Sequence, residues 1–323
     1  MSEPNRRDTA HSCVVSAPAD VLYGLVADVT RWPVVFEPCV HARFLERGAR
    51  EERIGVWARV GGEVRSWTSR RLLDPARLRI AFRQERGADP IASMSGAWSF
   101  RALAGVRTEV VLTHSFTAAG DGSALDWIAA AVDANSEREL AALRRLAEQE
   151  QPVDELVFSF TDQVRLPGAA ADAYEFVRRA DLWPRRLPHV GRVRLTEDPP
   201  GVQDLEMDTV TADGTAHTTR SIRLCFPAER IVYKQLVPPA LLFGHSGAWD
   251  FAPARGGGSV VTARHTVGIS PGAVREALGA GVTLAEARGR LREALGANSR
   301  ATIAHAGEHA HAAGVGGGTG AVA

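Results

Sequence analysis

The residues that could do chemistry in this chain are scattered and form no compact motif. The three cysteines, Cys13, Cys39 and Cys225, include no CxxC pair that could hold zinc, and they are too few for a disulfide framework. Possible metal ligands gather near the end of the sequence, but in an order that differs from HExxH. These residues are His305, Glu308, His309 and His311. We therefore expect no metal site.

The sequence also lacks the common nucleotide and hydrolase motifs. It contains no GxGxxG followed by an acidic residue, no Walker loop and no GxSxG turn. Gly256-Gly257-Gly258 lies between two strand-like runs and predicts a hairpin turn. Nucleotide-dependent enzymes and serine hydrolases are unsupported, and we expect no cofactor.

Charge and hydropathy exclude further classes. The 323 residues include 38 basic and 38 acidic side chains, so the formal net charge is zero. Duplex affinity comes mainly from many cationic contacts to phosphate, so a nucleic-acid partner is not expected. The first residues are polar, and no apolar run reaches the roughly 18 residues that a membrane span needs. We expect a cytoplasmic protein without a membrane partner.

The elements that must position any active groups occur twice. The segment SGAWSF at 95–100 returns as SGAWDF at 246–251, a displacement of 151 positions. Further matches keep the same order: Trp32-Pro33 with Trp183-Pro184, Tyr23 with Tyr174, Gln84 with Gln235, and His114 with His265. Asn135-Ser136 matches Asn298-Ser299, so the second copy has about a dozen extra residues, which we expect to form a loop near 271–283. The pattern predicts an internal duplication.

This duplication predicts two domains and a tail. The first copy should cover residues 9–151 and the second residues 152–306, with the seam in a polar stretch that ends at Pro152. Residues 307–323 contain Gly316-Gly317-Gly318 and almost no bulky side chain, which predicts a disordered tail.

Each copy has the pattern of an α+β domain. A strand is followed by two short helices, six strand-like runs and one long helix, expected at about 125–148 in the first copy and 284–305 in the second. These elements can bury their apolar faces if a curled antiparallel sheet wraps around the long helix, leaving an internal cavity. Tryptophans of the first copy should supply rings to that cavity or to the core. They are Trp32, Trp57, Trp67, Trp98 and Trp127.

The order of elements and several residues resemble the two-domain polyketide aromatase/cyclases of type II polyketide synthases, in the START-like helix-grip superfamily. The resemblance covers both copies, about 9–148 and 155–308. It rests on an Ala-Pro helix start, Trp32-Pro33 with Phe36, the Trp67–Arg71 strand, the Gly96-Ala97-Trp98 strand and Asn135-Ser136. It implies two tandem helix-grip domains, each with an internal cavity.

The resemblance also implies a function. Proteins of this family take a poly-β-ketone from an acyl carrier protein, and promote first-ring aldol closure followed by dehydration to an aromatic ring. Two-domain members are associated with chains already reduced at one ketone. Such a cofactor-independent, dehydrating cyclase would work in antibiotic-type biosynthesis and meet other type II polyketide synthase subunits transiently. Its task is to hold the chain in a reactive fold, stabilise oxyanions and shuttle protons.

The family's pocket serine and arginine fall on Ser69 and Arg71, which share one face of a strand because they are two residues apart. The resemblance implies that Arg71 donates to a developing oxyanion and that Ser69 holds substrate or a water. The alternative for Arg71 is a surface ion pair. Asn135 matches a polar position on the long helix, whereas a tyrosine position of single-domain relatives falls on Cys39. The expected pocket of the first copy also includes Trp32, Phe36, Trp67, Trp98 and His114.

The second copy differs more from the family. The match of Thr68-Ser69-Arg70 to Thr218-Thr219-Arg220 aligns His217, Thr219 and Ser221 with Trp67, Ser69 and Arg71. Its expected pocket residues are Trp183, His217, Thr219, Trp249 and His265. This copy either performs a different step, such as a dehydration with His217 or His265 in acid-base roles, or acts mainly as a structural partner.

A second function class remains open at this point. The same architecture often binds a hydrophobic small molecule without catalysis, because a fold does not fix a function. A binder or carrier would need an almost wholly apolar cavity, whereas Ser69, Arg71 and Asn135 meeting in one cavity would favour an enzyme. The direction of the Arg71 guanidinium separates the two hypotheses.

Overall fold

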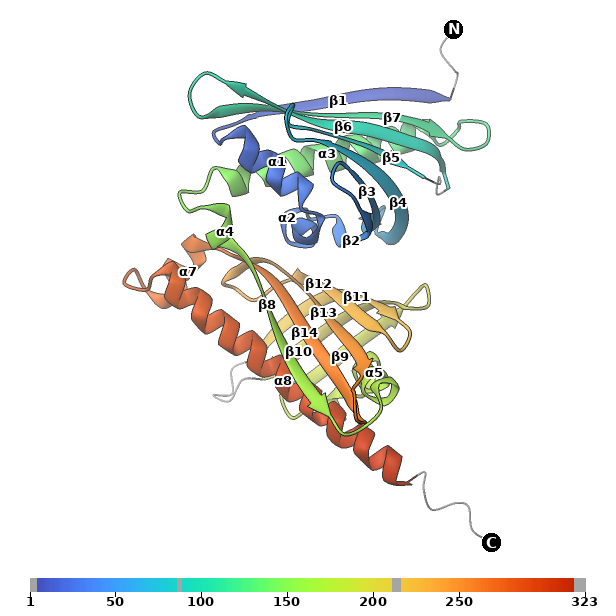
Figure 1. Ribbon diagram of the computed structural model, residues 1–323, viewed down its shortest axis with the longest axis vertical. Coiled ribbons are helices and arrows are strands. Elements are labelled where there is room, and N and C mark those ends of the chain that lie inside the picture. Colours follow the sequence, from blue (N-terminus) through green and yellow to red (C-terminus); the bar gives the residue numbers. More distant parts are fainter. Residues whose placement is uncertain (1–4, 86–88, 211–215, 317–323) are drawn as a thin grey trace. The chain divides into compact units, whose positions relative to one another are not determined.

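The chain divides into two compact units, residues Met1–Val153 and Asp154–Ala323 (Figure 1). The computed structural model describes residues 5–85, 89–210 and 216–316. The division lies two residues from the predicted seam at 151/152. We describe each unit by itself, as an N unit and a C unit.

The elements of the N unit follow the predicted order of strand, short helices, six strands and long helix. The helical elements are α1 (Ala19–Ala27), η1 (Val29–Arg31), α2 (Trp32–Val35) and α3 (Leu125–Ala147). The strands are β1 (Arg6–Val15), β2 (Cys39–Arg47), β3 (Glu51–Val60), β4 (Glu63–Asp74), β5 (Arg79–Gln84), β6 (Ile91–Leu103) and β7 (Arg107–Ala118).

The C unit repeats this order and adds two short helices, α4 (Val153–Leu156) and α7 (Pro271–Leu278). Its other helical elements are α5 (Ala170–Arg178), η2 (Ala180–Leu182), α6 (Trp183–Arg186) and α8 (Leu284–Gly316). Its strands are β8 (Val157–Leu166), β9 (Val190–Glu197), β10 (Val202–Val210), β11 (Ala216–Phe226), β12 (Arg230–Val237), β13 (Leu242–Pro253) and β14 (Ser259–Ile269).

Each unit contains one seven-stranded antiparallel sheet among the described residues. The strand orders are β1-β7-β6-β5-β4-β3-β2 and β8-β14-β13-β12-β11-β10-β9, so the first strand pairs with the last and the others form a meander. Strands β1 and β8 alternate in burial from residue to residue, as expected of strands with one face on the interior. The long helix packs against the sheet of its own unit, α3 on β1 and β7, and α8 on β8 and β14 (Figure 1).

The repeated Ser-Gly-Ala-Trp segment has a steric reason. Gly96 on β6 lies against Phe82 and the carbonyl of Thr113, where a Cβ would come within 2.0 Å of the oxygen. Gly247 on β13 lies in the same way against Tyr233, where a Cβ would come within 2.4 Å of the ring. In both units only glycine leaves room for the aromatic ring of the neighbouring strand.

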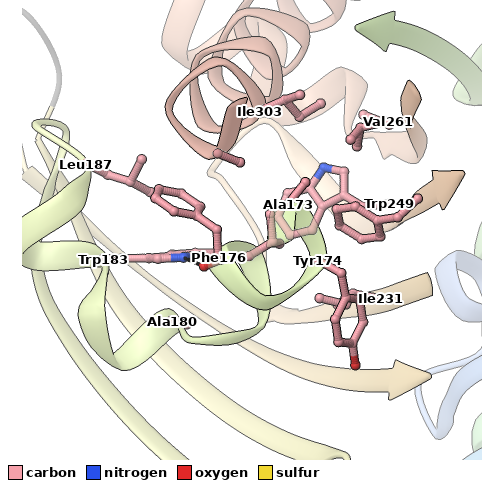
Figure 2. Packing of buried hydrophobic residues seen from close by; sticks show 14 of the residues in the cluster. Ala173, Tyr174, Phe176, Ala180, Trp183, Leu187, Ile231, Trp249, Val261 and Ile303 are labelled. Carbon is pink, nitrogen blue, oxygen red and sulfur yellow. Dashed lines mark hydrogen bonds between the residues drawn. The ribbon is translucent and has the colours of Figure 1, made fainter. Parts of the chain in front are cut away.

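The core of the C unit forms where α5 and α6 meet the sheet and α8. Phe176 on α5, Trp183 on α6 and Trp249 on β13 are buried together with Ile303 on α8 (Figure 2). In the N unit, Ile128 and Val132 of α3 pack with other apolar side chains around Phe116. Burial of such side chains removes about 25 cal/mol of unfavourable free energy for each Å² of apolar surface.

Two expectations about the end of the chain were wrong. The extra residues of the second copy form helix α7, because Ser270 caps its first turn and Pro271 occupies a position where no N–H is needed. Helix α8 continues to Gly316, well into the tail predicted for 307–323, since alanines at 310, 312 and 313 extend the helix-forming composition. The rest of that predicted tail, 317–323, lies outside the described residues.

No helix among the described residues is long and apolar enough to cross a lipid bilayer.

Candidate functional site

The N unit encloses a cavity of about 200 Å³ between its sheet and α3. Apolar and aromatic side chains form most of the wall. The ring of Phe36 lies 5.8 Å from that of Trp32 and 6.4 Å from that of Trp98, measured between centroids. The three catalytic and five pocket residues predicted for this copy all line the cavity: Ser69, Arg71 and Asn135, with Trp32, Phe36, Trp67, Trp98 and His114. Cys39 also lines it and is buried.

One of the predicted ring positions was wrong. Trp57 lies on the other face of β3, where its ring contacts His41 at 5.3 Å and the guanidinium of Arg43 at 5.5 Å. Its neighbours Val56 and Ala58 line the cavity instead. Strand parity explains the difference, because successive side chains point to opposite faces.

Arg71 is 1% exposed, which excludes the surface ion pair considered as an alternative. Its guanidinium holds the end of α1, where Nη2 donates to the carbonyls of Val26 at 3.0 Å and Ala27 at 3.2 Å, and Nη1 also donates to Ala27. The Glu52 carboxylate lies 3.5 Å away, and the Trp32 ring lies under the guanidinium at 5.3 Å. Burial lowers the pKa of Arg71 to about 10, so it remains charged at neutral pH.

This arrangement leaves Arg71 little capacity for a substrate. Carbonyls at a helix C-terminus carry negative partial charge, and a cation that satisfies them stabilises the helix end. Among the described residues, Nε of Arg71 has no hydrogen-bond partner, but it is buried. We therefore limit the oxyanion role expected of Arg71 to this one N–H, and regard the guanidinium first as a clamp between β4 and α1.

The C unit contains the same clamp. Arg223 on β11 is 1% exposed, and its Nη2 donates to the carbonyl of Val177 at the end of α5 at 2.5 Å. Its Nη1 donates to Gln203 Oε1 at 2.8 Å and lies 3.5 Å from the carbonyl of Arg178. The Trp183 ring lies 5.1 Å from the guanidinium. A neutral Gln203 therefore takes the place that the charged Glu52 has in the N unit.

This clamp corrects the alignment of the two copies. Val210 pairs with Ala216, whereas its counterpart Arg59 pairs with Val64, so the second copy has one more residue between β10 and β11. The sequence match displaced by 150 positions was therefore wrong by two residues in this strand. The correct counterparts of Arg65, Trp67, Ser69 and Arg71 are His217, Thr219, Ser221 and Arg223.

Sequence reasoning missed an acidic group in the N cavity. Glu139 on α3 lines the cavity, and burial raises its pKa to about 7. It lies four residues after Asn135 and three after Ser136, so all three share one face of the helix. This spacing in the sequence could have identified Glu139 as a residue facing the cavity. A carboxyl group with a pKa near neutral pH can both accept and donate a proton.

Other polar groups of the N cavity come from the sheet. Ser69 is 5% exposed on β4. His114 on β7 faces Phe82 with ring centroids 5.5 Å apart, and its buried Nδ1 has no hydrogen-bond partner among the described residues. Burial lowers the pKa of His114 to about 4, so its imidazole is neutral at neutral pH.

The C unit has its own cavity, of about 140 Å³. All five residues predicted for this copy line it: Trp183, His217, Thr219, Trp249 and His265. His217 is exposed, whereas Thr219 and His265 are buried. Within the described residues, no group of three His, Cys, Asp or Glu side chains could hold a metal ion in either unit.

A polar cluster in the C cavity was only partly foreseen. Tyr233 and His245 join His265 in it, and all three line the cavity. The available signal was strand parity, because His245 precedes the wall residue Trp249 by four positions on β13 and therefore shares its face.

Comparison with known proteins assigns the chain to a family. Over 316 residues it is 58% identical to the actinorhodin polyketide synthase bifunctional cyclase/dehydratase of Streptomyces coelicolor, covering 95% of this chain and 98% of that protein. The chain belongs to the polyketide synthase bifunctional cyclase/dehydratases. It is also 53% identical to a granaticin cyclase/dehydratase of Streptomyces violaceoruber, with 97% of each chain covered. Residues 15–142 match the family model described as polyketide cyclase / dehydrase and lipid transport.

Solved structures of the family agree with this assignment. The di-domain aromatase/cyclase BexL from the BE-7585A biosynthetic pathway is 48% identical, with a TM-score of 0.80 over 94% of this chain and 98% of that chain. StfQ from the steffimycin pathway is 38% identical, also with a TM-score of 0.80, over 95% and 99%. The predicted resemblance, the two tandem helix-grip domains and the class of enzyme are confirmed.

Proposed function

We propose that this bifunctional cyclase/dehydratase directs first-ring aldol closure and dehydration of a ketoreduced poly-β-ketone bound to an acyl carrier protein, with ring closure in the N cavity. The observation that carries the proposal is the Glu139 carboxyl, which lines the same cavity as Ser69 and Asn135, a cavity walled by aromatic rings. A methylene flanked by two carbonyls is acidic enough for a carboxylate whose pKa is about 7 to act as its base.

The ring-closing step transfers a proton to a base and back, and it forms two oxyanions in turn, an enolate and an alkoxide, that must be stabilised. The Glu139 carboxylate takes the methylene proton, and the resulting enolate carbon attacks a ketone of the same chain. The new alkoxide then receives a proton, which the Glu139 carboxylic acid can return directly or through a water. The Ser69 hydroxyl, the Asn135 amide and Nε of Arg71 are the donors available to the oxyanions. The rings of Trp32 and Trp98 hold the chain in a folded conformation.

The proposal requires no cofactor, because proton transfer and carbonyl polarisation use side chains alone. The acyl carrier protein is the proposed source of the substrate, and other type II polyketide synthase subunits are transient partners in the cytoplasm. A polar cluster inside the wall also argues against the alternative of a passive binder or carrier, since buried polar groups without a partner cost free energy unless a ligand uses them.

Reconstitution tests the proposal. A minimal polyketide synthase and a ketoreductase are combined with or without this protein, and the products are separated and identified by mass and NMR. We expect the complete mixture to give one first-ring regiochemistry, whereas the mixture without it gives several shunt products. Identical product mixtures would disprove the proposal.

A further inference from the structure

A continuous chain of hydrogen bonds crosses the buried part of the C cavity. Gln235 Oε1 lies 2.9 Å from His245 Nδ1, and His245 Nε2 lies 3.1 Å from His265 Nδ1. His265 Nε2 in turn lies 2.9 Å from Ser299 Oγ on α8. The hydroxyl of Tyr233 completes the cluster, 3.1 Å from His265 Nδ1 and 3.4 Å from His245 Nε2.

The direction of each bond follows from the first one. An amide oxygen only accepts, so His245 donates from Nδ1 to Gln235. A neutral His245 then accepts at Nε2, and His265 donates to it from Nδ1. His265 is left with a lone pair on Nε2, which accepts the hydrogen of Ser299. The chain therefore presents a serine hydroxyl to the cavity with a histidine base behind it.

Burial keeps the side chains of this hydrogen-bonded series uncharged. His245 and His265 are each 2% exposed, and Ser299 is 5% exposed. Burial lowers the pKa of His245 to about 3 and that of His265 to about 4, although Asp162 opposes the second shift. Both imidazoles are therefore neutral at neutral pH, and a protonated His265 would be a strong acid.

The N unit has Gln84 and Ser136 in the places of Gln235 and Ser299. Its described contacts include no series of hydrogen bonds between them. Met94 occupies the place of His245, and Phe82 occupies that of Tyr233. Ser136, the counterpart of Ser299, donates to the carbonyl of Val132 within its own helix at 2.8 Å. The buried Nδ1 of His114, the counterpart of His265, has no partner there. Packing of a shared fold explains the shared histidine, but it does not require the extra groups of the C unit.

We propose that the C cavity is a second catalytic site, in which Ser299 and His265 dehydrate the β-hydroxy ketone made by ring closure. Gln235 and His245 are positioning residues that fix the tautomer of His265. The inference rests on the proposed function and assigns its second step to the C unit. The substrate class is a cyclic β-hydroxy ketone with a hydrogen on the carbon between carbonyl and carbinol.

The proposed step balances without a cofactor. Ser299 Oγ takes the α-hydrogen as a proton while its own proton passes to His265 Nε2, and the C–H electron pair becomes that of the enolate. The enolate then forms the carbon–carbon double bond and expels hydroxide with the C–O electron pair. The proton on His265 returns through Ser299 to the hydroxide, so water leaves and both side chains recover their original state.

Matched variants of the two serines test this assignment. The reconstituted full-length protein is compared with Ser299→Ala and with Ser136→Ala, its counterpart in the N unit. We expect Ser299→Ala to slow dehydration about 100-fold, the typical scale of general acid-base catalysis, and to accumulate a ring-closed product heavier by one water. We expect Ser136→Ala to give the wild-type ratio of hydrated to dehydrated product. Circular dichroism melting shows whether both variants are folded.

The outcomes separate this inference from the proposed function. If the wild-type protein does not change the ring regiochemistry, the proposed function fails. If it does, but Ser299→Ala dehydrates at the wild-type rate, the second site is overturned while the ring-closing role stands. Accumulation of the hydrated product by Ser136→Ala alone would instead assign dehydration to the N cavity.

A second pair of variants tests the positioning role. Gln235→Leu should lower kcat for dehydration with little change in KM, because it frees the His245 tautomer while leaving a side chain of similar size in the cavity wall. Gln84→Leu, the matching change in the N unit, should leave kcat for dehydration unchanged. Equal effects of the two variants on kcat would contradict the positioning role of Gln235 and His245.

Discussion

The N unit and the C unit have the same fold, but different side chains line their cavities. In both, an arginine at the same place in the sheet donates to carbonyls at the end of a short helix, α1 or α5, and lies over a tryptophan ring, Arg71 over Trp32 and Arg223 over Trp183. The N cavity contains a carboxyl group, that of Glu139, whereas Thr302 has the corresponding place in the C cavity. A buried cation that lines a cavity is therefore not by that fact a catalytic group, because the copy with a different lining keeps it.

The largest difference between the units is expected in the stability lost when the clamp arginine is replaced by alanine. Arg71→Ala leaves the buried Glu52 carboxylate with the exposed Arg47 as its cation and leaves two helix-end carbonyls without a donor, and it should destabilise the N unit by about 3–5 kcal/mol. Arg223→Ala leaves only neutral groups unpaired, and should destabilise the C unit by about 1–3 kcal/mol. Urea unfolding, followed by circular dichroism, measures both. Equal losses would show that the charge on Glu52 makes no difference.

The next largest effect concerns Glu139. Glu139→Gln should slow ring closure about 100-fold, whereas Thr302→Val at the matching place in the C unit should not. The wild-type rate should fall as the pH drops below about 7, because the base is then protonated, and the variant should lose this dependence. A variant with a wild-type rate and pH profile would remove Glu139 from the mechanism.

Stability gives a second measurement on the same variant. Because the folded protein keeps the Glu139 proton up to about pH 7 while the unfolded chain loses it near 4.5, wild-type stability should fall across this interval. Glu139→Gln should remove that loss and be more stable by about 3 kcal/mol at neutral pH. Urea unfolding at pH 4 and at pH 7 checks it. A variant less stable than the wild type at pH 7 would argue against the raised pKa.

A smaller effect distinguishes the units in acid. A histidine whose pKa is lowered on folding contributes stability above pH 6.5. This stability is lost as the pH falls, because the unfolded chain then binds the proton more readily. The C unit has three such histidines in its cavity, His189, His245 and His265, and the N unit has His114, so the C unit should lose at least about twice as much stability between pH 6.5 and 4. Hydrogen exchange at several pH values follows each unit separately. His245→Met, the N-unit residue, should reduce the difference.

The smallest expected effect tests the clamp itself. Glu52→Gln gives the N unit the neutral partner that Gln203 provides in the C unit, and the change in stability should be about 1 kcal/mol or less. Urea unfolding of this variant beside Arg71→Ala measures it. A loss as large as that of Arg71→Ala would mean that the two clamps are not equivalent.

Much of the fold could be predicted from the sequence because the duplication gave two samples of one pattern. Alternating strands, glycine turns and the repeated Ser-Gly-Ala-Trp segment fixed the order of elements in both copies. The α7 segment was predicted as a loop because eight residues carry little periodicity, although Ser270 and Pro271 mark a helix start.

The cavity walls were also predictable, but the chemistry of their groups was not. Spacing could place Ser69 and Arg71 on one face of β4, yet it could not show that Arg71 donates to Val26 and Ala27, which are more than forty positions away. The raised pKa of Glu139 depends on burial by several elements at once. The His245–His265 contact likewise joins two strands whose register only the folded sheet defines.

The glycine against the aromatic ring has a consequence for re-engineering this protein. Gly96 and Gly247 leave space on β6 and β13 for a ring from β5 or β12, and that ring is phenylalanine in one unit and tyrosine in the other. The socket thus accepts a hydroxyl without a change in backbone. Exchanging Phe82 and Tyr233 between the units offers a way to move a phenolic hydroxyl from one cavity to the other.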